Sequence, residues 1–146
     1  MTMEIRIAEV SDAKACTKIN ETIWGSEWKD PAYHRERARN GELIIALEKG
    51  NIVGYVVFRK GFWKNNYFIE EMAVDPKNQG KGIGSALIKK IEEICSTENA
   101  RLFSSADSEN TTSLRFHEKM GFTKAGFIKN MFKEGKKEII FTKKSW

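Results

Sequence analysis

The chain has 146 residues, 40% hydrophobic and 31% charged, which is the composition of an ordinary soluble globular protein, and we expect one domain over residues 1–146. The net charge of +5 is compatible with an anionic ligand, while lysines spread over many segments and the lack of a nucleic-acid-binding motif argue against nucleic acid as the main partner. No window approaches the roughly 20 apolar residues of a membrane span, and the N-terminus lacks the apolar core of a signal peptide, so a cytoplasmic protein is expected.

The N-terminal half predicts a strand, two helices and a hairpin. Residues 4–10 alternate polar and apolar side chains, as a half-buried strand does. Ser11 is placed to cap a helix that runs to about Trp24, and Pro31 is placed to open a short second helix. Two further strands, over 42–48 and 52–59, follow around a tight turn.

The middle of the chain predicts a strand, a helix and a second strand. The segment 67–74 is β-prone, and apolar residues at helical spacing predict a helix from about 82 to 96. A short strand over 101–106 follows. Since a helix joins these two strands, we expect them to be parallel neighbours connected by a crossover.

The C-terminal part predicts one more helix and a final hairpin. Asn110 or Thr111 is placed to cap the helix, which ends at Gly121. Strands over 124–133 and 136–144 then complete the chain. The resulting order, β-α-α-β-β-β-α-β-α-β-β, indicates an α/β fold with a mixed sheet and helices on both faces, and not a doubly wound dinucleotide fold.

A glycine-rich segment lies between the strand at 67–74 and the helix after it, and reads Gln79-Gly-Lys-Gly-Ile-Gly84. Glycines let the backbone approach a ligand closely, and the first N–H groups of a helix attract anions. The dinucleotide fingerprint fails because its third glycine is Ser85 here. The ATP-binding P-loop fails because its lysine must precede Ser or Thr, and Gly82 stands there.

This segment resembles the acyl-CoA loop of the GNAT superfamily of N-acetyltransferases, in which Gln-x-x-Gly-x-Gly follows a strand ending in Met-Ala-Val. Residues 110–122 resemble the GNAT segment in which an Asn opens a helix ending in Phe-Tyr-Glu-Lys-Leu-Gly-Phe. Residues 45–55 resemble that family's second and third strands. The three segments agree in order and spacing. The resemblance covers about residues 4–144 and implies acetyl transfer from acetyl-CoA to an amine.

The resemblance also implies where acetyl-CoA binds. Its pantetheine arm would lie between two splayed strands and pair with the main chain of Met72, Ala73 and Val74, where backbone N–H groups would also meet the oxyanion. Asn110 corresponds to a family Asn near the pantetheine, although a plain helix cap explains it equally well. Lys81 would add a cation beside the phosphates, or be an ordinary loop lysine. The residues implied to hold the pyrophosphate are Gln79, Gly80, Lys81, Gly82, Ile83, Gly84 and Ser85.

Acetyl transfer needs a base, because only a neutral amine attacks the thioester. Glu70 and Glu71 precede the pantetheine strand, and strand alternation predicts that at most one faces the site unless a bulge intervenes. In the similar polyamine acetyltransferases the first of the two acids is the base, which corresponds to Glu70. We therefore expect Glu70 to act as general base in preference to Glu71, which stays open as the alternative base. A role only in substrate binding or solubility is the other alternative.

An acid for the leaving thiolate is less clearly indicated. The family commonly has a tyrosine where this chain has His117, which either replaces that tyrosine or is an ordinary polar residue of its helix. The sequence holds no metal-ligand spacing, so no metal is expected. The two cysteines, Cys16 and Cys95, are expected to be small buried hydrophobes.

The acceptor is expected to bind at the loops 25–40 and 59–66, which carry aromatic and acidic residues. These suit a small amine, such as a polyamine, an aminoglycoside or an amino-acid derivative. Core packing or a homodimer surface is the alternative for each aromatic residue. A protein N-terminus or lysine stays open as acceptor, and a non-catalytic acetyl-CoA-binding sensor is the rival function. The residues are Trp24, Glu27, Trp28, Asp30, Tyr33, Glu36, Phe62 and Trp63.

Overall fold

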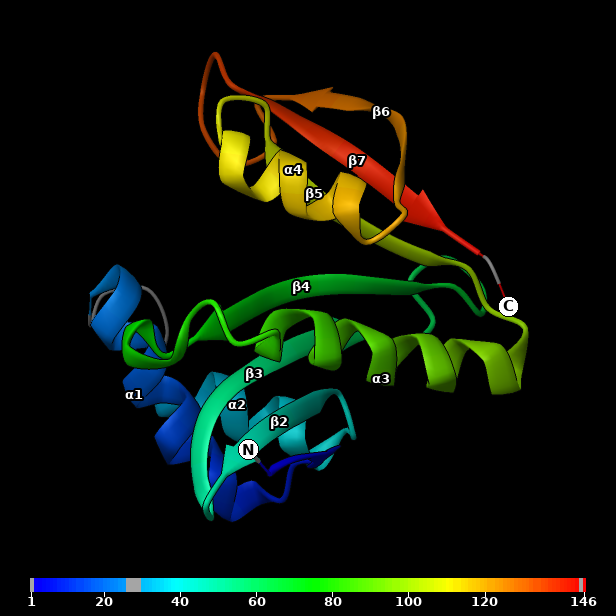
Figure 1. The fold of residues 1–146 in the computed structure, drawn as a ribbon. Helices are drawn as coiled ribbons and strands as arrows, with labels where there is room; N and C mark the ends of the chain where they lie inside the picture. Colours follow the sequence, from blue (N-terminus) through cyan, green and yellow to red (C-terminus); the bar gives the residue numbers. More distant parts are fainter. Residues whose placement is uncertain (1, 26–29, 145) are drawn as a thin grey trace.

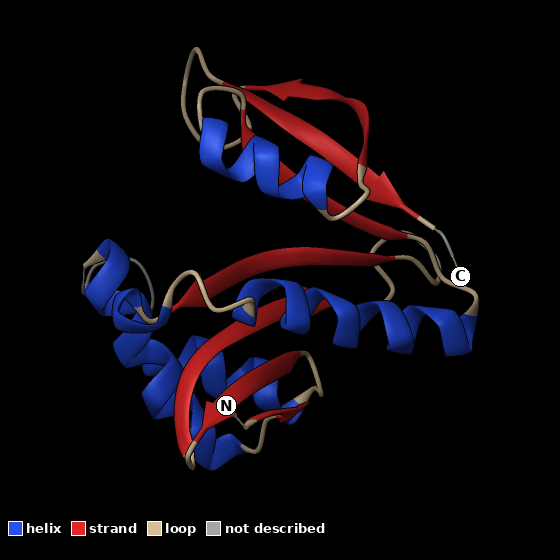
Figure 2. Cartoon of the chain, in the orientation of Figure 1, coloured by secondary structure: helices blue, strands red, loops and turns tan. Residues whose placement is uncertain are grey.

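A seven-stranded mixed sheet organises the computed structural model, which describes residues 2–25, 30–144 and 146 (Figures 1 and 2). The strand order is β1-β2-β3-β4-β5-β7-β6, and β4 and β5 are the parallel pair. The expected α/β fold and element order are confirmed. The strands are β1 (Met3–Ile7), β2 (Leu43–Glu48), β3 (Asn51–Arg59), β4 (Tyr67–Val74), β5 (Leu102–Asp107), β6 (Thr123–Lys129) and β7 (Lys137–Lys143).

The first helix begins later than the sequence suggests. A 3-10 turn, η1 (Val10–Asp12), precedes α1 (Ala13–Trp24), so the expected cap at Ser11 is wrong. Asp12 explains the difference, because its carboxylate accepts the Glu9 N–H at 2.8 Å and an Arg6 N–H at 2.9 Å. Those bonds stabilise a tight turn before the α-helix starts.

The remaining helices start close to where the sequence places them. Pro31 opens α2 (Pro31–Arg39), and Asp30 caps it by accepting two backbone N–H groups. Gly82 precedes α3 (Ile83–Glu98), and Asn110 caps α4 (Thr111–Lys119). A second 3-10 turn, η2 (Pro76–Asn78), links β4 to the glycine loop.

Two hydrophobic clusters divide the helices between the two faces of the sheet. The helices α1 and α2 pack on one face, where Cys16, Tyr55 and Ala73 are buried together. Residues of α3 and α4 join the other cluster, which includes Cys95 and Phe141. Each cysteine is therefore a small buried apolar side chain, as expected, in a cluster of its own.

The parallel strands β4 and β5 separate along their length. Their pairing covers Tyr67 with Leu102 and Phe68 with Phe103, at the start of both strands. Figure 1 shows the two strands diverging toward the end where α3 and α4 begin. This is the splayed arrangement that the resemblance implies. It brings the glycine loop and the N-terminus of α4 to the same end of the molecule.

Candidate functional site

The glycine loop before α3 has a backbone suited to an anion. Gly80 and Gly82 have φ angles of 79° and 80°, a left-handed conformation that other residues adopt only with strain. A Cβ built on either glycine would meet no atom within 4 Å, so a ligand can approach the backbone there. Gly82 is the N-cap of α3 and has no side chain to satisfy the first helical N–H groups. These groups fit the pyrophosphate of acetyl-CoA.

Lys81 lies in this loop but is held by protein oxygens. Its Nζ is 3.0 Å from Asn78 Oδ1 and 3.5 Å from Glu48 Oε1, at the end of β2. The cation is thus beside the loop, with its ammonium directed toward these two side chains. A contact between Lys81 and a phosphate stays a prediction.

The main chain of residues 72–74 lies where the two parallel strands have separated. One edge of this segment is paired with β3, where Val56, Tyr55 and Gly54 are the partners. The other edge faces the gap where β4 and β5 have separated. An extended ligand chain could therefore pair with it as a further strand. At α4, Asn110 Oδ1 accepts the Ser113 N–H at 3.1 Å, so the structure gives Asn110 a capping role.

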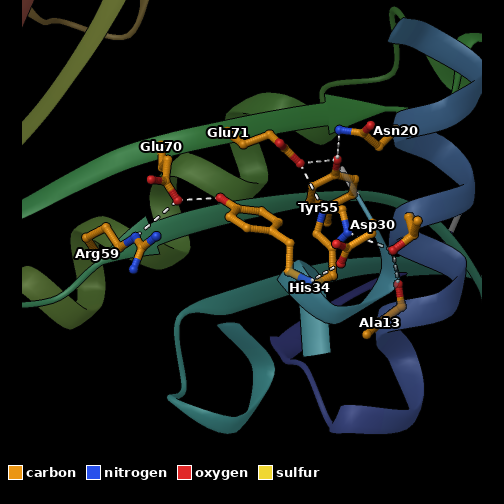
Figure 3. A network of polar contacts seen from close by, with 10 residues as sticks. Ala13, Asn20, Asp30, His34, Tyr55, Arg59, Glu70 and Glu71 are labelled. Carbon is orange, nitrogen blue, oxygen red and sulfur yellow. Dashed lines mark hydrogen bonds and ion pairs between the residues drawn. The ribbon is translucent and has the colours of Figure 1, made fainter. Parts of the chain in front are cut away.

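Glu70 and Glu71 lie on the same face of the sheet, toward α1 and α2 (Figure 3). Along β3, Val57 opposes Glu71 and Phe58 opposes Ile69, so Glu70 is an extra residue in β4. Such a β-bulge breaks the alternation of side chains. The expectation that only one of the two carboxylates faces the site is therefore wrong, and the bulge is the reason.

Glu70 is paired with an arginine and a tyrosine. Its Oε2 is 3.0 Å from Arg59 Nε, and the Tyr33 hydroxyl donates to the same oxygen. The side chains of Arg59 and Glu70 are 38% and 32% exposed. Burial, and then the hydrogen bond to Glu70, raise the pKa of Tyr33, so its hydroxyl stays protonated. The result is an accessible pair of opposite charges on β3 and β4.

Glu71 is the more enclosed carboxylate, with a side chain 10% exposed. Its Oε1 accepts from the Tyr55 hydroxyl and lies 2.9 Å from Nε2 of His34, whose side chain is fully buried in α2. Burial, and then the charge of Glu71, raise the pKa of Tyr55, which remains a donor. An acid and an imidazole in direct contact form a candidate proton-transfer pair.

Helix α1 contributes the residues that contact His34 and Tyr55 on the side away from Glu71 (Figure 3). His34 Nδ1 is 2.8 Å from Thr17 Oγ1, and Thr17 Oγ1 is 3.1 Å from the Ala13 carbonyl. Asn20 Nδ2 donates to the Tyr55 hydroxyl oxygen at 3.3 Å. We did not expect His34 at the site from the sequence. The available signal was that the polar residues Thr17 and Asn20 interrupt the apolar face of α1.

His117 lies in a different environment, inside the cluster under α4. Its Nδ1 is 2.7 Å from the Ser113 carbonyl, which only accepts, so Nδ1 carries the proton and Nε2 accepts from the Ser104 hydroxyl at 2.8 Å. The ring stacks on Phe141 at 4.3 Å, and burial lowers the pKa of His117. Of the two roles that the sequence left open, this geometry favours that of a neutral structural residue.

The candidate acceptor-binding residues divide between the site and other positions. Tyr33 reaches Glu70, whereas Asp30 serves as the cap of α2. Phe62 packs on Phe68 with ring centroids 4.9 Å apart, and Trp63 is 79% exposed. Glu27 and Trp28 lie outside the described residues.

Two further observations concern the described ranges as a whole. No helix in them is long and apolar enough to cross a membrane. Over the same residues, no three His, Cys, Asp or Glu side chains are grouped in a way that could hold a metal ion.

Comparison with known proteins identifies the family. The model of the Acetyltransferase (GNAT) family matches residues 13–122. The chain belongs to the GNAT acetyltransferase family. This GNAT protein is 30% identical to the L-methionine sulfoximine/L-methionine sulfone acetyltransferase of Salmonella typhimurium, over 83% of the chain and 80% of that protein. It is 28% identical to the L-amino acid N-acyltransferase MnaT of Escherichia coli, over 82% and 79% of the two chains.

A solved structure supports the same assignment at the level of the fold. A GNAT-family acetyltransferase from Bacillus cereus superimposes with a TM-score of 0.86 at 21% identity, covering 100% of this chain and 99% of the other. The GNAT chain is thus an acetyl-CoA-dependent N-acetyltransferase. The open glycine loop, the uncapped start of α3 and the splayed strands fit acetyl-CoA as the acetyl donor.

Proposed function

We propose that this GNAT enzyme acetylates the α-amino group of a small amino-acid-like molecule. The observation that carries the proposal is the accessible pair Arg59–Glu70, in which a guanidinium and a carboxylate lie side by side on one face of the sheet. A free amino acid has the complementary pair of charges, a carboxylate and an ammonium separated by one carbon atom. The pair can therefore receive both ends of such a substrate.

The geometry of Arg59 supports this assignment. A guanidinium has five N–H donors, and the contact to Glu70 uses Nε at 3.0 Å. The two terminal nitrogens form a fork that matches a carboxylate in a bidentate arrangement. Glu70 would then accept from the substrate ammonium, beside the Tyr33 hydroxyl that already donates to it. The names of two relatives, which act on L-methionine sulfone or sulfoximine and on L-amino acids, point to the same substrate class.

The proposed mechanism is direct attack of the amine on the thioester, with Glu70 as general base. Glu70 takes a proton from the ammonium, and the neutral amine attacks the carbonyl carbon of acetyl-CoA. Backbone N–H groups near residues 72–74 would stabilise the oxyanion, and the two substrates are held in contact by the splayed strands. We assign no proton donation to His117, since both of its ring nitrogens are engaged within the protein.

The substrate class is tested by measuring thiol release from acetyl-CoA over a panel that pairs each amino acid with the amine lacking its carboxylate. Methionine sulfone and its decarboxylated counterpart are one such pair. We expect Arg59→Met to raise KM for the amino acid about tenfold, while KM for the paired amine changes less than twofold. Arg39→Met is the matched control, because Arg39 is also exposed and pairs with a glutamate, Glu36, at 3.7 Å.

The proposed base is tested with Glu70→Gln. We expect kcat to fall about 100-fold at neutral pH while acetyl-CoA affinity stays within twofold of wild type. An unchanged pH–rate profile would remove Glu70 from this role. Thiol release with peptides or polyamines but with no amino acid would overturn the substrate class, and acetyl-CoA binding without thiol release from any amine would favour the sensor.

A further inference from the structure

A hydrogen-bonded pair of side chains lies across the splay from Glu70. Ser105 of β5 donates from Oγ to Oε2 of Glu138 in β7 at 2.8 Å. The last paired residues of β4 and β5 are Phe68 and Phe103. Glu70 and Ser105 each come two residues later, so they lie at about the same level of the two strands, across the gap between them (Figure 1).

Strand alternation directs Ser105 away from α4. Its neighbour Ser104 contacts His117 of α4, so Phe103 and Ser105, which flank Ser104, point to the opposite face of the sheet. Glu138 points to that face as well, since it contacts Ser105. The side chains of this face are half-buried in both β5 and β7, so a ligand can reach them.

The same face continues onto β4, where the acceptor is proposed to bind. The ring of Phe62 lies beside both Phe68 and Phe103, with centroid distances of 4.9 and 6.2 Å. The residue after Phe68 is Ile69, which belongs to the α3 cluster, so Phe68 points to the face of α1 and α2. Glu70 faces α2 on this side too. An acceptor held at Glu70 therefore shares one face with the hydrogen-bonded pair.

Glu138 brings negative charge to this face. Ser105 donates to its Oε2, which leaves Oε1 to accept from a ligand. No ion pair of the described residues joins Glu138 to a lysine, arginine or histidine. Burial raises the pKa of Glu138, the Ser105 hydrogen bond opposes this shift, and the charge of Asp107, its partner in the register of β5 and β7, adds to it. A bound cation would offset the repulsion between these carboxylates.

An apolar surface lies between the two ends of the proposed acceptor site. Ile140 is the register partner of Ser105 and comes two residues after Glu138, so it shares their face, beside Phe103. One strand separates β4 from β7, so their backbones are about 10 Å apart at the ordinary strand spacing and farther apart in the splay. A long aliphatic side chain suits this separation.

We propose that Glu138, held by Ser105, is a specificity-determining residue that selects an amino-acid acceptor with a long cationic side chain, such as lysine or arginine. This inference rests on the proposed function and refines its substrate class. Arg59 receives the α-carboxylate, Glu70 receives the α-ammonium, and Glu138 receives the cation of the side chain. Each charge of the substrate then meets one opposite charge, on β3, β4 and β7 in turn.

The selection is tested with amino acids that differ only at the end of the side chain. Norleucine is lysine without its ε-amino group, so it fills the same site without the second cation. We expect kcat/KM for thiol release to be about tenfold higher for lysine than for norleucine, mainly through KM. In Glu138→Gln, which still accepts the hydrogen bond of Ser105 but has no charge, this ratio should fall below about twofold.

Glu134→Gln is the matched control, because Glu134 is an exposed acid of the loop before β7 and its replacement removes the same charge. It should keep the wild-type ratio. Ser105→Ala should lower the ratio about threefold, since Glu138 keeps its charge but loses the bond that orients it. An unchanged ratio in Glu138→Gln, or an equal change in Glu134→Gln, overturns the inference.

A second pair of substrates needs no variant. Citrulline has nearly the shape of arginine but no charge, so KM of the wild-type enzyme should be about tenfold lower for arginine, and equal values overturn selection for a cation. Mass spectrometry of acetylated lysine should place the acetyl group on the α-nitrogen, and acetylation of the ε-nitrogen overturns the proposed orientation. Equal use of lysine and norleucine would refute this inference and leave the amino-acid proposal standing. Thiol release with no amino acid would refute both.

Discussion

The two histidines of the chain show how a partner decides what a buried imidazole can do. Both are nearly or fully enclosed, and both ring nitrogens of each are engaged. His34 faces a carboxylate, Glu71, whereas His117 faces a carbonyl and a hydroxyl. His34 therefore contacts an ionisable partner, whereas the two partners of His117 are neutral.

Among the residues that the structure describes, His117 has no carboxylate partner. The Ser113 carbonyl fixes a proton on Nδ1, the Ser104 hydroxyl donates to Nε2, and Phe141 covers the ring face. Burial lowers the pKa of His117, although the hydrogen bond to the Ser113 carbonyl opposes this shift, so the ring is favoured in its neutral form. The same residue type thus contacts a carboxylate on the α2 side of the sheet and neutral groups on the α4 side.

The largest difference in stability between the two histidines should appear when each is replaced by leucine. We expect His34→Leu to lower the free energy of unfolding by about 3 kcal/mol, since it leaves the enclosed Glu71 carboxylate without its hydrogen-bond partner on α2. We expect His117→Leu to cost about 1–2 kcal/mol, because only neutral hydrogen-bond partners lose their bonds. Urea unfolding of both variants measures the comparison.

A double variant separates the charge effect from packing. In His34→Leu/Glu71→Leu no charge is left enclosed, so most of the lost stability should return. A double variant no more stable than His34→Leu alone would contradict the view that the loss comes from the Glu71 carboxylate left without His34. An equal loss in the two leucine variants would remove the distinction between the histidines.

Local features of this chain were predictable from the sequence. The glycine loop, the start of α2 at Pro31 and the cap at Asn110 each depend on a few neighbouring residues whose backbone preferences are strong. The order of strands and helices followed from hydrophobic periodicity. The start of α1 was misplaced because Asp12 competes as an acceptor for nearby N–H groups and extends the turn.

The carboxylate site depended on contacts that no local pattern contains. His34 and Glu71 are 37 residues apart, and they meet because α2 lies on the face of the sheet toward which the Glu71 side chain points. The bulge at Glu70 is a shift in the pairing register between β3 and β4, so the sequence of β4 alone cannot reveal it. The role of His117 likewise depends on Ser104 from β5 and Phe141 from β7.

A smaller effect is expected in the pH dependence of stability. Because burial lowers the folded-state pKa of His117, the unfolded chain binds this proton more readily. The stability from the neutral ring is complete above about pH 6.5, the ordinary histidine pKa, and is lost progressively as the pH falls below it. We expect His117→Gln to lose stability less steeply than wild type between pH 7 and pH 5, and a parallel decline in the two proteins would contradict a neutral buried His117.

The smallest effect is expected from the Ser104 hydroxyl, which contacts His117 Nε2. Ser104→Ala removes the donor to Nε2, and we expect a loss of about 1 kcal/mol at pH 7. The unpaired nitrogen should then accept a proton more easily, so the loss relative to wild type should shrink toward pH 5. Ser105→Ala is the matched control, because the next serine of β5 donates to Glu138 at 2.8 Å. If both variants respond to pH in the same way, the hydroxyl of Ser104 does not set the protonation of His117, and burial alone keeps that ring neutral.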